Sequence, residues 1–142
     1  MRCWTRPGGL SKAEREMIVV ATSAVNHCHY CVIAHGAILR IRAKQPLLAD
    51  QVAINYLNAD LTPRQRAMLD FAVKVAGRSH EVNDADFAAL KAHGMTDDDI
   101  WDIGAIAALF ALLQPDGQPA GAAAQRRVLC DGTSLTGWQA PP

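Results

Sequence analysis

The sequence predicts an all-α fold, a single domain of about six helices. Helix-start signals recur along the chain, beginning with Ser11 and Glu14, which form a capping-box pattern. Apolar residues repeat with helical spacing, and the flanks of the cysteine pair at 28 and 31 show no alternating β-branched strand pattern. A chain of 142 residues, of which 50% are hydrophobic, is long enough to bury one core.

Each predicted helix has its own start or stop signal. We expect Asn26 to cap the second helix, whose basic end at 40–44 should be solvated. Pro63 stands at the first position of the fourth helix, and Asn83 caps the fifth, which Gly94 ends. The predicted helices lie at 12–26, 27–42, 47–57, 63–77, 84–93 and 96–113.

The last predicted helix combines an acidic start with an apolar body. Three aspartates at 97–99 lie in its first turn, where the helix dipole stabilises carboxylates, so capping explains them better than a metal site. From 103 to 113 the helix is apolar on nearly every side and must be buried on more than one face. In so small a chain we expect another subunit to cover the second face, and we predict a homo-oligomer.

The charge balance excludes several classes of protein. Fourteen basic residues balance fourteen acidic ones, so no net field attracts nucleic acid or an anionic membrane. The first nine residues lack the apolar region of a signal peptide, and the longest apolar run is about half of the roughly 20 residues that span a bilayer. We expect a cytoplasmic enzyme or small-molecule binder, in a compartment where paired cysteines are more often catalytic than structural.

The segment 26–35 carries the clearest chemical signal. Cys28 and Cys31 form a C-x-x-C pair, and His35 follows four residues later. On a helix these residues fall at i, i+3 and i+7, so two thiols and an imidazole share one face. A thiol in the first turn also feels the positive end of the helix dipole, which lowers its pKa from about 8.5. The pattern indicates a redox or metal site.

Two other interpretations of the pair stay open. A zinc site needs about four ligands, and His27, Cys28, Cys31 and His35 would supply them from little more than two helical turns, where a tetrahedral site is hard to close. Alternatively, both cysteines are inert core residues, although the neighbouring histidines argue against this interpretation.

A spaced motif around the pair resembles a known family. Glu16, which taken alone would be solvated by default, precedes Cys28 by twelve residues and completes the pattern E-x11-C-x-x-C-x3-H. This pattern resembles the signature of the alkyl hydroperoxidase D (AhpD) and carboxymuconolactone decarboxylase-like family. The resemblance covers about residues 8–113, with one departure at Tyr30, where many AhpD-type proteins have histidine. Three further segments resemble the peroxidase-related branch of the family: 10–17, 55–61 and 66–71.

The resemblance implies an AhpD-like helical domain and a thiol-dependent peroxidase of the peroxiredoxin type, which reduces organic hydroperoxides. By position, Cys31 attacks the peroxide, Cys28 resolves the product, and Glu16 and His35 relay the proton. Tyr30 can orient a water, but a phenol with a pKa of about 10 cannot replace an imidazole base. No metal or cofactor is implied; the partners are the hydroperoxide and an external dithiol reductant, which is a protein or a small thiol.

Two arguments disagree about which of the two thiols attacks the peroxide. Cys28 lies nearer the helix N-terminus and on that ground should have the lower pKa. His35 lies one turn beyond Cys31 and can act directly as its base, which agrees with the family assignment.

Two other functions remain: a metal-binding or thiol–disulfide regulatory module, and a carboxymuconolactone decarboxylase-like lyase, whose branch generally lacks C-x-x-C.

The chain divides into the AhpD-like domain at 1–113 and a tail at 114–142. The tail is rich in Pro, Gly and Ala, has no periodicity, and is predicted to be disordered. It does not resemble the family, yet codons exist for 114–121 and 125–135 that, read one base later, encode the family-like peptides Asn-Arg-Met-Ala-Asn-Arg-Leu-Gly and Ser-Ala-Glu-Phe-Tyr-Ala-Met-Gly-Arg-Ala. We therefore predict that the tail arises from a frameshift and that Cys130 has no role.

Overall fold

The computed structural model describes residues 9–114, which form an all-α bundle without a strand in that range. The predicted fold class and its six α-helices are confirmed. Two short 3-10 helices, Tyr56–Asn58 and Ser79–Glu81, follow the third and fourth helices. The α-helices are α1 (Lys12–Val25), α2 (His29–Ala43), α3 (Leu48–Asn55), α4 (Pro63–Arg78), α5 (Asp84–Ala92) and α6 (Asp97–Leu113).

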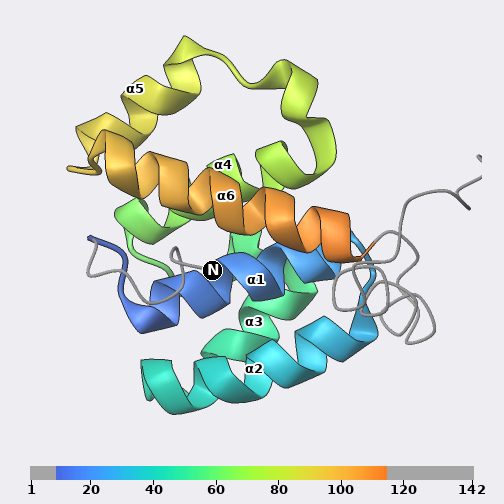
Figure 1. Ribbon diagram of the computed structural model, residues 1–142. Helices are drawn as coiled ribbons and strands as arrows, with labels where there is room; N and C mark the ends of the chain where they lie inside the picture. Colours follow the sequence, from blue (N-terminus) through green and yellow to red (C-terminus); the bar gives the residue numbers. More distant parts are fainter. Residues whose placement is uncertain (1–8, 115–142) are drawn as a thin grey trace, which may run out of the picture.

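Helix α1 is the centre of the bundle. It packs against α2 and α3 on one side and against α4 and α6 on the other, as Figure 1 shows. The sequence predicts a single apolar stripe, but the structure buries every residue from 14 to 23. Polar side chains on α1 therefore lie in the core and require internal partners, because an unpaired buried polar group is costly.

Four helices begin with the predicted kind of capping interaction. In α1 the backbone N–H of Glu14 donates to Ser11 Oγ, and Glu14 Oε2 accepts from the N–H of Ser11. Reciprocal capping boxes also start α4, α5 and α6. The acidic first turn of α6 is a capping feature, as predicted: Asp99 pairs with Thr96 and also accepts a hydrogen bond from the Gly9 N–H.

The predicted cap of α2 is wrong. Asn26 is the C-cap of α1, and Cys28 is the N-cap of α2. His27 adopts a left-handed conformation (φ 54°), its N–H donates to Ala24 O, and the N–H of Cys28 donates to Ser23 O. These bonds are those of a Schellman motif, which ends α1 before a second helix can begin. Gly94 (φ 75°) ends α5 in the same way, as predicted.

Apolar side chains remain exposed on several helices. On α6, Ile103 and Ile106 lie in the core, whereas Trp101 is 72% and Leu112 70% exposed. On α2, Ile33 and Ile41 are also exposed. The expected burial of α6 on two faces is therefore not met within one chain, and the homo-oligomer stays a prediction. In the described part of the chain no helix combines the length and the apolarity that a bilayer crossing requires.

Only Gln114 of the tail 114–142 belongs to the described residues, and its side chain is buried. The predictions for the rest of that tail, including the frameshift and the lack of a role for Cys130, lie outside the described residues.

A buried ion pair joins α1 to α6. Arg15 Nη2 lies 3.0 Å from Asp102 Oδ2, and the two side chains are only 3% and 4% exposed. Two buried charges of this kind depend on each other, because neither retains enough water to remain charged alone.

Removing one partner of this pair should destabilise the protein strongly. We expect Arg15→Ala to lower the free energy of unfolding by about 3–5 kcal/mol, since it leaves Asp102 buried and unpaired. The double variant Arg15→Met/Asp102→Leu should recover most of the loss. Lys91→Ala, which breaks the exposed Lys91–Asp97 pair, is the matched control and should cost under about 1 kcal/mol in denaturant titration. Equal losses for Arg15→Ala and Lys91→Ala would contradict this role.

Candidate functional site

The tight turn between α1 and α2 determines where the two thiols lie. Because Cys28 both completes the Schellman motif and serves as the N-cap of α2, its sulfur lies at the positive end of that helix. Its side chain makes no capping hydrogen bond. Cys31 follows in the first turn, and both cysteines are free thiols. Cys28 is buried and Cys31 is half-buried.

Burial raises the pKa of the Cys31 thiol to about 11, and its hydrogen bond and proximity to Cys28 add to this effect. Hydrogen bonding from Gln114 and Ser23 acts in the opposite direction and favours the thiolate. Near neutral pH the Cys31 thiol is therefore protonated at rest. Chemistry at this sulfur requires a base.

A buried carboxylate connects α1 to α2. Glu16 has a side chain that is 0% exposed, and its Oε2 lies 2.8 Å from His35 Nδ1. Its other oxygen, Oε1, lies 2.6 Å from Arg42 Nη1. An ionised carboxylate can only accept hydrogen bonds, so it orients the imidazole with its hydrogen on Nδ1. Glu16 therefore bonds to residues of the next helix, as the family spacing implies. It is not solvated, as a glutamate taken alone would be expected to be.

The last turn of α6 covers the site. The ring of Phe110 meets the imidazole of His35 edge-on, with centroids 5.1 Å apart. One turn later, Gln114 Nε2 donates to Ser23 Oγ at 2.8 Å, and Asn26 Nδ2 donates to Gln114 Oε1 at 3.4 Å. Ser23 and Gln114 are both buried. The end of α6 is thus joined to the turn that carries Cys28.

The structure brings most of the predicted site residues into one region. Cys28 and Cys31 interact with each other, and Glu16 holds His35 one helical turn beyond Cys31. Tyr30, in contrast, is 60% exposed.

Sequence reasoning missed the functional environment supplied by Arg42, Phe110 and Gln114. Arg42 belongs to the basic segment that was expected to be solvated, but it binds a buried carboxylate. Phe110 lies in an apolar helix and Gln114 at the start of an irregular tail, so neither carried a local signal.

The donor set for a zinc site is not assembled. Among residues 9–114, no three His, Cys, Asp or Glu side chains are grouped so that they can hold a metal ion. His35 instead binds Glu16, and His27 is the left-handed residue of the turn.

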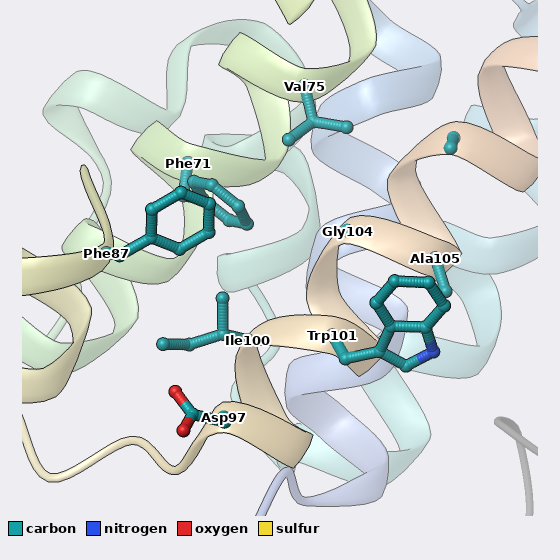
Figure 2. A pocket seen from close by; sticks show the side chains of 9 residues that line it. Phe71, Val75, Phe87, Asp97, Ile100, Trp101, Gly104 and Ala105 are labelled. Atoms are coloured by element: carbon teal, nitrogen blue, oxygen red, sulfur yellow. The ribbon is translucent and has the colours of Figure 1, made fainter. Parts of the chain in front are cut away.

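An apolar pocket lies elsewhere on the bundle. It has a volume of about 430 Å³ and is formed by α4, α5 and α6. Figure 2 shows the rings of Phe71 and Phe87 close together on one side of this pocket and Trp101 on the other. None of its lining residues belongs to the thiol site, so the pocket is separate from the cysteine pair and from the Glu16–His35 hydrogen bond.

Comparison with known proteins identifies the family of this helical fold. The model of the carboxymuconolactone decarboxylase family matches residues 1–46. A crystal structure from Ralstonia eutropha JMP134, described as an alkylhydroperoxidase AhpD core and an uncharacterized peroxidase-related protein, superposes with a TM-score of 0.77 at 60% identity. An uncharacterized peroxidase-related protein from Silicibacter sp. TM1040 superposes with the same TM-score at 42% identity.

These matches cover 84% and 80% of this chain, which spans 66% and 59% of the two solved structures, respectively. No curated protein matches the chain. The two similar structures share the helical fold of this chain, and the matched family model includes the segment that carries both cysteines and His35. The chain therefore belongs to the carboxymuconolactone decarboxylase family, in its AhpD-like, peroxidase-related branch.

Proposed function

We propose that this protein is a thiol-dependent peroxidase that reduces organic hydroperoxides through Cys31 and Cys28. The observation that carries the proposal is the hydrogen bond between the buried Glu16 carboxylate and His35. It holds an imidazole one helical turn from a thiol that is protonated at rest. Such a pair of base and orienting carboxylate is the usual means of activating a weak nucleophile.

The first step oxidises Cys31. His35 accepts the thiol proton, the thiolate sulfur attacks one oxygen of the hydroperoxide, an S–O bond forms and the O–O bond breaks. The departing alkoxide takes the proton from His35 and leaves as an alcohol. Cys31 is then a sulfenic acid, two electrons more oxidised than the thiol.

The second step closes the cycle. The Cys28 sulfur attacks the sulfenic sulfur, water leaves, and a Cys28–Cys31 disulfide forms. An external dithiol reduces this disulfide by exchange and is itself oxidised to a disulfide. The proposed partners are therefore a hydroperoxide and a dithiol reductant, and the cycle uses no metal or cofactor.

The arrangement favours Cys31 as the attacking thiol over Cys28, despite the position of Cys28 at the helix end. A high thiol pKa makes the resting thiolate rare but makes the thiolate more nucleophilic once it is formed. The environment supplies both the proton acceptor and two neutral hydrogen-bonding groups, Ser23 and Gln114, that favour the developing charge.

The competing functions have less support. A lyase of the wider family would not use the thiol pair, and a metal-binding module lacks an assembled donor set among the described residues. A thiol–disulfide regulatory module would use the same two sulfurs but has no need for a base one helical turn from Cys31. Peroxide consumption by the thiol variants therefore separates it from a peroxidase.

The pH dependence of Cys31 alkylation tests its protonation state. Because burial and Cys28 hold its pKa near 11, iodoacetamide should modify Cys31 about tenfold faster for each unit of pH between roughly 7 and 10. Peptide fragmentation in a mass spectrometer locates the modified residue. In Cys28→Ser the rate should level off at lower pH, because the contribution of Cys28 is lost. A rate that is already constant above pH 8 in the wild type would contradict the raised pKa.

Single-turnover kinetics test the division of labour between the thiols. In a Cys3→Ser/Cys130→Ser background, Cys31→Ser should consume no cumene hydroperoxide, since a serine hydroxyl is not ionised near neutral pH. Cys28→Ser should consume about one equivalent and stop as a sulfenic acid that dimedone traps. The opposite result would reverse the roles, and consumption by both variants at the wild-type rate would rule out the pair as the peroxide site.

A further inference from the structure

The carboxylate of Glu16 has two partners, and only one of them belongs to the proposed relay. Its Oε2 accepts from His35 Nδ1, and its Oε1 accepts from Arg42 Nη1. The Glu16 side chain has no exposed surface, whereas the Arg42 side chain is 31% exposed. The guanidinium therefore links a fully buried anion to the protein surface.

The two partners lie on the same face of α2. Arg42 follows His35 by seven residues, which is two helical turns, and so it reaches the same point on α1. Arg40, two residues earlier, pairs with Asp50 of α3 instead.

The charge of Arg42 determines which atoms of Glu16 and His35 carry a proton. A guanidinium stays charged at every accessible pH, so it stabilises the Glu16 carboxylate while His35 is neutral. The neutral imidazole then donates Nδ1–H to Glu16, and its Nε2 is left as the base. Without the guanidinium, the Glu16–His35 pair would bind a further proton at higher pH, either on the carboxylate or on the imidazole. In either case Nε2 would carry a hydrogen and could not accept one from Cys31.

We propose that Arg42 is a positioning residue of the thiol site, which keeps His35 in its proton-accepting form by sharing the Glu16 carboxylate. This inference rests on the proposed peroxidase function, because it gives Arg42 a role in that reaction. It also makes a claim about His35 alone that can be measured without peroxide.

Two other charged groups of α1 are paired with residues of α6 and α4. Arg15 of α1 pairs with Asp102 of α6, and Glu14 of α1 pairs with Arg64 of α4. On α2, Cys31 lies one helical turn before His35, and α6 contributes Phe110, which packs on the His35 ring and does not titrate. Among residues 9–114, Arg42 is thus the cation that hydrogen-bonds to Glu16 beside His35.

An NMR titration of the His35 imidazole protons tests the proposal on the reduced full-length protein. His35→Gln identifies the signal among the five histidines. In Arg42→Gln, the midpoint of this titration should rise by about one pH unit or more relative to wild type, the scale expected when a unit charge near a buried pair is removed. Arg42→Lys should restore most of the difference, because it keeps a cation. Arg40→Gln is the matched control and should leave the midpoint unchanged.

The pH dependence of single-turnover peroxide consumption gives the second readout. In Arg42→Gln the rising limb should move to higher pH by the same amount, with nearly the wild-type rate above it. A lower rate at every pH with no shift of the limb, or a His35 midpoint equal to that of Arg40→Gln, would overturn the proposal. Should Arg42→Gln fail to fold, Arg42→Met provides a second neutral variant. If the His35 midpoint shifts but wild type consumes no peroxide, the peroxidase proposal fails while the assignment of Arg42 stands.

Discussion

The buried carboxylate of Glu16 is the constraint on which the site depends. It lies on the central helix of the bundle, where water cannot solvate it, so α2 must bring donors to it. The imidazole of His35 and the guanidinium of Arg42 meet this requirement from one face of α2. Their hydrogen bonds fix the rotation of α2 against α1, and the same rotation sets the position of both thiols.

Backbone geometry and helix α6 add to this constraint. The left-handed turn at His27 ends α1 and starts α2 at Cys28, so the first turn of α2 carries both sulfurs. Phe110 and Gln114, at the end of helix α6, then cover the thiol site. The resulting burial makes the Cys31 thiol hard to ionise, and in our account the relay supplies the proton acceptor that burial makes necessary.

The parts of the structure that depend on local sequence were predictable. Capping boxes indicated closely where helices start, and Gly94 indicated where α5 ends, because these signals act within one helical turn. The N-cap of α2 was predicted at Asn26 and lies at Cys28, because a left-handed conformation is uncommon for a residue other than glycine and had no local signal at His27. Of the site, the C-x-x-C and His35 were visible in the sequence, and Glu16 through its family spacing. Arg42 and Gln114 were not, since their partners lie 26 and about 90 residues away.

The most direct test of the thiol-peroxidase account is the state of the two sulfurs after reaction with peroxide. Reduced wild-type protein would be mixed with one equivalent of cumene hydroperoxide, free thiols blocked, and the peptide that contains both Cys28 and Cys31 weighed by mass spectrometry. The account predicts that this peptide loses two hydrogen atoms and resists blocking, while an equal amount of cumyl alcohol appears. Two blocked thiols on that peptide after the peroxide has been consumed would contradict it.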